Sequence, residues 1–382
     1  MFRKLICFFL SAALMLPCAA VARADPGDDT AVFHNAKAVA VLETQCLQTA
    51  VEYQADTVYN VAGLSRLPAL VYICEAFDKG LITADTAVYV SEIAAGIGGP
   101  TAFIASGESI AAGALIKAAV MITAGDASFA LAETVAGSVS LAENAIAGIL
   151  MELGVGSGDF SLSGGKSMMS AREVCTLMAR LAKSPTYQEY SAMTYDEIAH
   201  ENGSKTELAN PNKLIKSLEG CYAGSTGSSS EAGYCGAFAI KRGGTNYVVA
   251  VLGASNSDTR FSMAKEAAGI AFNTYETVSA VKEGDIVVPG VAVLGGMKRA
   301  VDAVSTRNVV LLIKKGDTWA MTPEVPEAVN APVKKGDVIG YAIYSSEQGA
   351  EALRIALAAA EDIGKAGWGE LILFVLRAWV HG

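Results

Sequence analysis

The segment from Tyr59 to Gly80, YNVAGLSRLPALVYICEAFDKG, has the composition expected at the start of a buried helix that carries a nucleophile. Ser65 is the hydroxyl residue nearest to the start of its apolar run. A serine nucleophile needs a base within reach, and on a helix the residue three positions later lies one turn away. The residue at that position is Pro68, which has no basic group. Ser65 therefore lacks the partner that serine chemistry requires.

The same three-residue spacing joins Gly63 to Arg66, but this pair cannot perform the chemistry either. Glycine has no side chain, and a guanidinium stays protonated at any useful pH, so Arg66 cannot accept a proton as a base. Two residues along a helix correspond to a turn of about 200°. Ser65 should therefore face away from the direction of Gly63, and a shift of register to Ser65 restores no catalytic pair.

Histidine and cysteine residues show no metal-site spacing, and there is no CxxC motif. We predict no metal and no cofactor. The odd, widely spaced cysteines do not form a disulfide framework, although Cys221 and Cys235 could pair in an exported protein. The residues concerned are His34, His200 and His381, and beyond residue 24 Cys46, Cys74, Cys175, Cys221 and Cys235.

The first 24 residues indicate export. The basic pair Arg3-Lys4 precedes an apolar run over residues 5–16, and Ala22-Arg23-Ala24 has the small-x-small pattern of a cleavage site. A permanent membrane-spanning helix is the alternative, but it needs about 20 apolar residues. This run is shorter and is closed by Pro17. We predict a signal peptide over residues 1–24, which leaves a mature chain of 358 residues.

Length and charge limit the kinds of protein that this chain can be. A single core stops growing at roughly 250 to 300 residues, so the mature chain should contain more than one domain. Hydrophobic residues make up 52% of the sequence and charged residues 18%, so the chain has enough apolar residues to form hydrophobic cores. Removal of the signal peptide changes the formal charge from −10 to −13. This acidic balance argues against a nucleic-acid partner.

The first part of the mature chain should combine strands with a block of helices. Apolar and polar residues alternate between residues 31 and 57, which predicts a half-buried hairpin of two antiparallel strands. Small and apolar residues recur at helical spacing from 64 to 153 and predict closely packed, buried helices. Residues 167–185 predict one more amphipathic helix, with Ser170 as its N-cap and Pro185 past its end.

Strands return in the second half. Residues 234–254 predict a hairpin whose turn contains Gly243-Gly244, followed by a helix over 257–276. Strands with helices on their faces predict a mixed α+β domain that ends near residue 277. Residues 278–347 predict a small all-β domain, because short β segments alternate there with Lys-Gly and Gly-Asp turns.

Residues 348–382 are predicted to be helical and amphipathic. The last apolar run is too short to span a bilayer, but it could lie in the membrane surface with Trp368 and Trp379 at the headgroup level. The alternative is a helix that packs on the β domain or on a partner chain. We therefore predict a membrane-anchoring helix at this end of the chain.

Several stretches, in order, resemble the low-molecular-mass penicillin-binding proteins, which are serine-type D-alanyl-D-alanine carboxypeptidases. The resemblance implies a β-lactamase/transpeptidase-like domain over residues 25–277, an antiparallel sheet with a helical subdomain, followed by the small all-β domain and the membrane anchor. The stretches are Val61–Arg66 with the helix after it, ALIKAAVMITAGDASFALAE at 114–133, MSAREV at 169–174, NPNKLI at 210–215, and Tyr222-Ala223-Gly224 followed by Ser225 and Thr226.

The resemblance also implies which positions the catalytic residues should occupy. Gly63 stands at the nucleophile, Arg66 at the lysine, Ala124 at the serine of Ser-x-Asn with its asparagine absent, and Tyr222-Ala223 at the first two residues of Lys-Thr-Gly. No catalytic side chain is intact. Loss of one member of such a constellation can lower the rate by many orders of magnitude. The resemblance therefore predicts the fold of the peptidase without its reaction.

Our main interpretation is an exported, membrane-associated, catalytically inactive homologue of peptidoglycan maturation. It would bind a peptidoglycan stem peptide or regulate an active penicillin-binding protein. The candidate binding residues are Arg66, Tyr222, Gly224, Ser225 and Thr226.

Other interpretations stay open. The guanidinium of Arg66 could face the ring of Tyr222 and fill the cleft, or the two residues could bind a carboxylate or a sugar. The protein could still be an active carboxypeptidase with a rearranged site. The small all-β domain could also carry the function, with the α+β domain acting only as a spacer.

Overall fold

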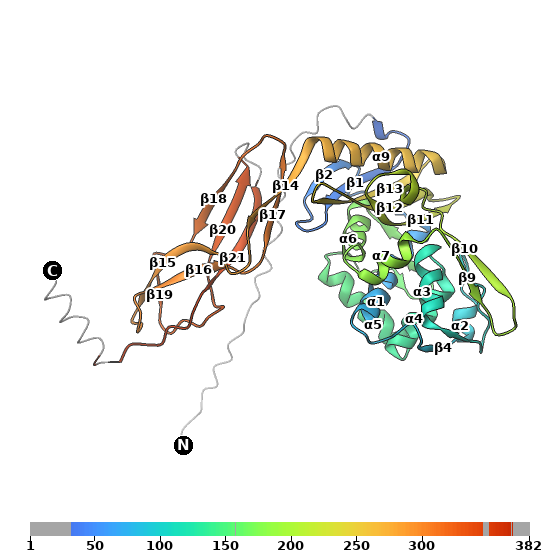
Figure 1. Cartoon of the computed structure of the whole chain (residues 1–382), viewed down its shortest axis with the longest axis horizontal. Coiled ribbons are helices and arrows are strands. Elements are labelled where there is room, and N and C mark those ends of the chain that lie inside the picture. Colours follow the sequence, from blue (N-terminus) through green and yellow to red (C-terminus); the bar gives the residue numbers. More distant parts are fainter. Residues whose placement is uncertain (1–31, 157, 347–350, 368, 370–382) are drawn as a thin grey trace, which may run out of the picture.

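The computed structural model describes residues 32–156, 158–346, 351–367 and 369. They form an α+β domain and a smaller all-β domain, joined where α9 (Ser257–Thr274) ends and β14 (Tyr275–Val281) begins (Figure 1). The two domains touch beyond this connection. The amide of Leu312 donates to Gln48 Oε1 at 2.8 Å, and the hydroxyls of Thr245 and Thr277 lie 2.8 Å apart.

A five-stranded antiparallel sheet forms the centre of the α+β domain. Its strand order is β11-β12-β13-β1-β2, so β11 is an edge strand. The predicted hairpins are confirmed, because β1 pairs with β2, and β12 pairs with β13 across a turn in which Gly243 and Gly244 both have positive φ. The strands are β1 (Ala38–Glu43), β2 (Thr49–Tyr53), β11 (Cys221–Ser229), β12 (Gly233–Arg242) and β13 (Thr245–Ala254).

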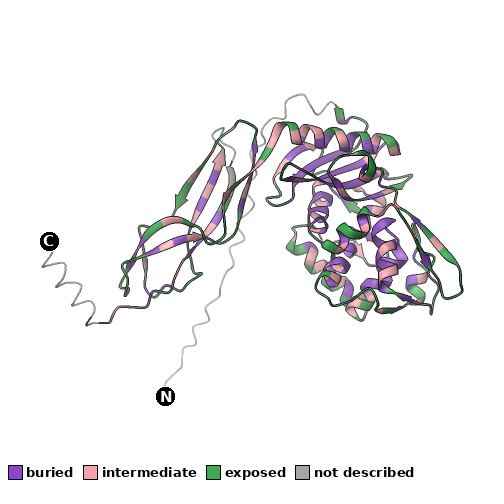
Figure 2. Ribbon diagram, viewed as in Figure 1, coloured by how far each residue is buried: buried purple, intermediate pink, exposed green. Residues whose placement is uncertain are grey.

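Helices cover both faces of this sheet (Figure 1, Figure 2). In β1, Ala40 and Leu42 pack toward the helical block, whereas Val39 and Val41 pack toward α9. Every residue of β1 is buried, so the expectation of a half-buried strand is wrong here. The reason is that successive side chains alternate between two faces and neither face meets solvent.

The helical block lies on the face opposite α9. The predicted helix after Ser170 is confirmed as α6, and its start is a capping box in which Ser170 accepts from the amide of Glu173 and the Glu173 carboxylate accepts from the amide of Ser170. The helices of this block are α1 (Leu67–Asp78), α2 (Glu92–Ala95), α3 (Ala112–Met121), α4 (Gly125–Ala136), α5 (Val139–Glu152), α6 (Ala171–Leu181) and α7 (Pro185–Ala192). The short helix α8 (Leu214–Ser217) packs instead on the α9 face, where Leu214 shares a cluster with α9.

Short strand pairs and one 3₁₀ turn, η2 (Ala62–Arg66), connect these elements. Within the described residues no single helix is long and apolar enough to cross a membrane, and α4 with α5 passes that test only as a pair bent by 95°. The short strands are β3 (Tyr59–Asn60), β4 (Ala87–Tyr89), β5 (Ser109–Ala111), β6 (Phe160–Ser161), β7 (Gly165–Lys166), β8 (Met168–Met169), β9 (Tyr195–Ala199) and β10 (Lys205–Ala209).

The β domain contains a six-stranded sheet, order β18-β20-β21-β16-β15-β19, and the pair β14-β17. The prediction of a helix beginning at residue 348 is wrong for residues 351–359, which form strand β21. Ile355, Leu357 and Ala359 alternate into the core of the domain, as a strand requires. The strands are β15 (Ile286–Leu294), β16 (Ala300–Ser305), β17 (Val309–Lys314), β18 (Trp319–Glu324), β19 (Ala328–Asn330), β20 (Val338–Ser346) and β21 (Glu351–Ala359).

The possible disulfide between Cys221 and Cys235 is absent, because both thiols are free and buried. Cys221 packs in the cluster on the α9 face of the sheet, and Cys235 packs in the cluster on the helical face. Side chains on opposite faces cannot approach within bonding distance.

A buried carboxylate joins the β9-β10 hairpin to the loop before β5. Glu108 Oε2 accepts from the amide of Ala105 at 2.9 Å, and Glu108 Oε1 accepts from the amide of Glu201 and lies against His200 Nδ1, both at 3.1 Å. Burial alone would raise the pKa of Glu108, but these amides and the imidazole outweigh it and hold the pKa below its usual value. The ionised carboxylate therefore stabilises the folded state.

Replacement of Glu108 by glutamine should cost about 2 kcal/mol of folding free energy at pH 7. Because the folded-state pKa is depressed, the stabilisation is present above the unfolded-state pKa of about 4.3 and is lost as the pH falls through the folded value. Urea unfolding between pH 7 and pH 3 should thus show a smaller loss of stability in Glu108→Gln than in the native chain. The exposed Glu266→Gln is the control, and equal slopes in all three proteins would contradict the prediction.

Candidate functional site

Gly63 lies in the η2 turn directly before α1, in contact with two other segments. A β-carbon built on it would lie 3.2 Å from Thr123 Oγ1, 3.3 Å from Gly227 Cα and 3.4 Å from the carbonyl oxygen of Thr226. The turn thus meets the loop before α4 on one side and the backbone of β11 on the other. The helix entrance where a nucleophile is expected lies at the junction of three segments and carries no side chain there.

Ser65 faces elsewhere, as the helical geometry predicted. A β-carbon on Gly165 of β7 would lie 2.8 Å from Ser65 Oγ, so the hydroxyl is packed against β7 and not against β11. The neighbouring Lys166 is buried, and its ammonium is held by Asp159 Oδ1 at 2.8 Å. Ser65 therefore has no free base beside it.

Strand β11 brings Ser225-Thr226-Gly227 to the η2 turn, and not Tyr222-Ala223-Gly224. The approach of the backbones is so close that a β-carbon on Gly227 would lie 2.3 Å from the amide nitrogen of Gly63. The assignment of Tyr222-Ala223 to the Lys-Thr position is therefore corrected by three residues. The available signal was the pair Thr226-Gly227, which retains two of the three residues of Lys-Thr-Gly.

Tyr222 lies away from this junction. Its hydroxyl accepts from Asn246 Nδ2 at 2.8 Å, near the start of β13, and the ring packs against the helical core. Arg66 and Tyr222 have different partners, so the idea that the guanidinium faces this ring is wrong. Ala223 is buried and packs in the same core.

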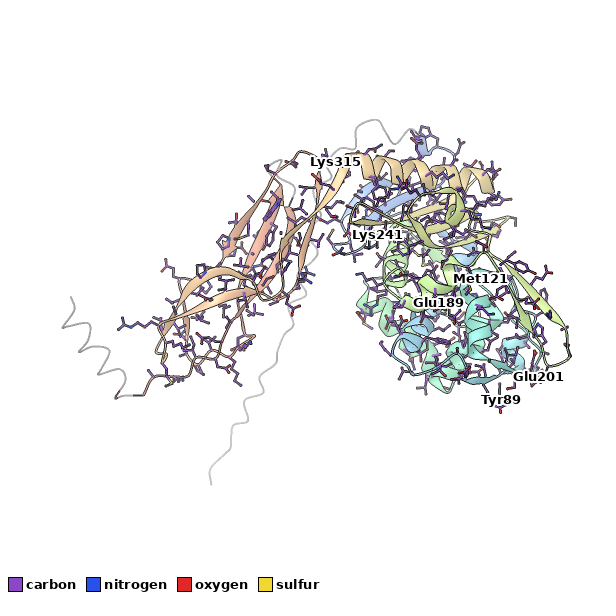
Figure 3. All side chains as sticks on the ribbon, in the orientation of Figure 1. Tyr89, Met121, Glu189, Glu201, Lys241 and Lys315 are labelled. Carbon is purple, nitrogen blue, oxygen red and sulfur yellow. The ribbon has the colours of Figure 1, made fainter. Side chains whose placement is uncertain are left out.

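Helix α7 covers the middle of β11. The amide of Gly224 donates to Ser191 Oγ at 2.8 Å, the same hydroxyl lies 3.2 Å from the carbonyl oxygen of Gly224, and Ser225 Oγ lies 2.8 Å from the hydroxyl of Tyr187. Helices α3 and α7 are in contact, and Figure 3 labels Met121 at the end of α3 and Glu189 on α7. Gly224 and Ser225 are thus structural contacts of α7.

The loop before α4 also differs from expectation. Thr123, with φ of 54°, places its hydroxyl beside Gly63, whereas Ala124 is fully buried at the N-cap of α4. If Thr123-Ala124-Gly125 is read as the Ser-x-Asn triplet, no residue before Asp126 is deleted. Threonine then retains the first hydroxyl, and glycine replaces the asparagine.

The guanidinium of Arg66 occupies the space that a side chain at residue 125 would need. A β-carbon on Gly125 would lie 2.9 Å from Arg66 Nη2 and 3.2 Å from its Cζ. Arg66 Nη1 donates to the carbonyl of Leu162 at 3.0 Å. Desolvation lowers the pKa of Arg66 and nearby Asp126 opposes this shift, yet an arginine stays charged in proteins. The arginine at 66 and the glycine at 125 are therefore sterically linked.

Arg260 of α9 is a second cationic group at this junction that the sequence patterns did not indicate. It is 4% exposed, and its Nη1 donates to the carbonyl of Cys235 at 3.1 Å and lies 3.4 Å from that of Gly227. Its Nε is buried without a partner. Desolvation lowers the pKa of this guanidinium. Its place in the first turn of a surface helix gave no signal of this role.

No set of three or more metal-binding side chains is grouped within the part of the chain that the structure describes. A cavity of about 750 Å³ lies in the β domain between β18, β19 and β20, and one of about 50 Å³ lies at the domain junction. Neither cavity touches the Gly63 junction.

The chain is similar to known proteins over both of its domains. A family model described as D-alanyl-D-alanine carboxypeptidase matches residues 26–256, more than half of the chain. The chain belongs to the D-alanyl-D-alanine carboxypeptidase family. A second model, penicillin-binding protein 5, C-terminal domain, matches residues 275–365. This membership places the chain among proteins of peptidoglycan metabolism.

Relatives in this carboxypeptidase family match over most of the chain. The D-alanyl-D-alanine carboxypeptidase DacF of Bacillus subtilis is 26% identical over 387 residues, which cover 99% of each chain. DacC of Escherichia coli is 25% identical over 76% of this chain and 74% of its own. Penicillin-binding protein 5 from Haemophilus influenzae has the same fold, with a TM-score of 0.76 and 19% identity over 87% of this chain and 98% of its own.

The resemblance to this carboxypeptidase family gives each residue of the junction an expected counterpart. Gly63, Arg66, Gly125 and Ser225 stand where the resemblance places the nucleophile, its lysine, the asparagine and the strand lysine, and Thr123, Thr226 and Gly227 stand at the other motif positions. A hydroxyl without a base is a weak nucleophile, and arginine cannot serve as that base.

Proposed function

We propose that this protein is a catalytically inactive member of the carboxypeptidase family, exported to the cell envelope, where it acts by binding or regulation. The observation that carries the proposal is Gly63. Gly63 lies in the turn directly before α1. A β-carbon built on it would lie within 3.4 Å of the Thr123 hydroxyl and of the β11 backbone, but glycine supplies no nucleophile there. The proposed ligand is a peptidoglycan stem peptide, and an active penicillin-binding protein is the alternative partner.

A rearranged active site would need another hydroxyl with a base. Ser65 packs against Gly165, Thr123 Oγ1 donates to the carbonyl of Ile122 at 2.7 Å, and Ser225 Oγ is paired with Tyr187. The cation at the centre of the junction is Arg66, which cannot act as a base. These contacts favour the inactive interpretation over a rearranged enzyme.

Labelling with a fluorescent penicillin tests the proposal. We expect no covalent label on the purified protein and no release of D-alanine from a D-alanyl-D-alanine peptide, because acylation needs a nucleophile in the junction. An active carboxypeptidase treated in parallel controls for the reagents. A stable covalent label, mapped to a residue of the junction by mass spectrometry, would overturn the proposal and favour a rearranged enzyme.

We further propose that the end of the chain holds the protein at the outer face of the cytoplasmic membrane. Residues 370–382 lie outside the described residues, so this proposal rests on the apolar, tryptophan-containing sequence from 368 onward. Removal of the residues after Gly367 should move the protein from the membrane fraction to the soluble fraction. If the shortened protein stays with the membranes, this segment is not the anchor.

A further inference from the structure

Arg66 has more hydrogen-bond donors than its surroundings satisfy. A guanidinium carries five N–H donors, and the hydrogen bond of this side chain among the described residues is the one from Nη1 to Leu162. The residue is partly exposed to solvent. The family lysine at this position is a compact point charge, whereas the arginine presents a planar fork.

The nearest acid does not neutralise this fork by direct contact. Both oxygens of Asp126 accept from the amide of Ala102 at 2.9 Å, and Asp126 Oδ1 also accepts from the amide of Ala127. Asp126 influences Arg66 electrostatically, while its carboxylate accepts hydrogen bonds from backbone amides. The carboxylate is committed to the backbone, and the positive charge of Arg66 is left available for another anion.

Two glycines flank the side chain of Arg66. Gly63 lies one turn before it, and the guanidinium packs against Gly125, where a β-carbon would lie 2.9 Å from Nη2. Thr123 directs its proton to the carbonyl of Ile122, so the hydroxyl does not compete as a donor at this place. The hydrogen bond to Leu162 and the contact with Gly125 therefore hold the guanidinium in position.

We propose that Arg66 is a carboxylate-binding residue, so that the place of the former proton-transfer lysine has become an anion receptor. Arginine binds carboxylates through two parallel N–H···O bonds, which lysine cannot reproduce. The ligand class is a peptide that ends in a free carboxylate. This inference rests on the proposed function, since it names what the inactive site binds.

Isothermal titration of the full chain with N-acetyl-D-alanyl-D-alanine and with its C-terminal amide tests the proposal. A hydrogen bond to a charged group contributes about 1.5–3 kcal/mol, so the free acid should bind about tenfold to a hundredfold more tightly than the amide. Arg66→Gln should lose this preference, and Arg66→Lys should retain only part of it. Higher salt should weaken binding of the acid more than binding of the amide.

Arg354→Gln is the matched control, because this exposed arginine lies in the β domain and pairs with Glu324. Thermal unfolding of each variant checks that it is folded. If Arg66→Gln does not fold, Arg66→Lys is used as the test variant in its place. Equal affinity for acid and amide, unchanged binding in a folded Arg66 variant, or no binding of either peptide to the native chain would overturn the inference. These outcomes leave the absence of penicillin labelling unaffected, whereas a covalent label would overturn the proposed function whatever the titration shows.

Discussion

Gly63→Ser alone should leave the protein unlabelled by a fluorescent penicillin, whereas the combination of Gly63→Ser, Arg66→Lys, Gly125→Asn and Ser225→Lys should gain covalent labelling. Members of a catalytic constellation act as a unit, so restoring one of them recovers almost nothing. The combination returns the nucleophile, its lysine and the two other missing polar groups to a framework that keeps Thr123, Thr226 and Gly227. We expect acylation at least about 1,000-fold faster than in the single variant.

The geometry bears on the substitutions at residues 63, 66 and 125. A β-carbon at residue 63 meets its neighbours at 3.2 Å or more, so serine needs shifts of only a few tenths of an ångström. Asparagine at 125 needs the arginine to be removed and Ile97 to shift, because Arg66 Nη2 would lie 2.9 Å and Ile97 Cγ2 2.8 Å from its β-carbon. The rate of labelling is measured by gel fluorescence over time.

The variant with three changes and glycine at 63 is the control for non-specific labelling. It should stay unlabelled, and thermal unfolding should show that all variants are folded. If the fully restored variant folds but does not label, the framework has diverged beyond these four side chains.

Gly227→Ala should lower the stability of the α+β domain by about 3 kcal/mol, which corresponds to a fall of about 5–10 °C in its Tm. The new β-carbon would lie 2.3 Å from the amide nitrogen of Gly63 and 2.7 Å from its Cα. Both contacts are with backbone atoms, which cannot rotate away as a side chain can. Strand β11 and the η2 turn must then separate, and calorimetry should detect the loss.

Gly148→Ala is the matched control for this substitution. Gly148 lies in the interior of α5, and a β-carbon there has no atom within 4 Å. Alanine should stabilise this helix by about 0.5–1 kcal/mol, because glycine is the poorer helix former. If both variants lose or gain stability equally, the close approach of Gly227 to Gly63 is not what fixes β11.

Local patterns predicted the main helices and hairpins of the α+β domain, but not its short strand pairs such as β4-β5. Ser170 with Glu173 predicts the start of α6, and Gly243-Gly244 predicts the β12-β13 turn, because a cap and a tight turn depend on residues only a few positions apart. The tail was harder to predict. The apolar residues of 351–359 fit a helix or a strand by composition, and pairing with β20 and β16 selects the strand.

The sequence by itself determined that Gly63 and Arg66 stand one turn apart before a strongly apolar helix, where the family resemblance places a nucleophile and its lysine, because this spacing is local. Only the tertiary structure decided which residues face Gly63. Thr123 and Gly227 come from segments about 60 and 160 positions away, and a shift of a few residues in either changes every contact at the junction. The structure also revealed that Arg66 fills the space above Gly125. That coupling depends on distances between atoms of separate helices, which no local pattern records.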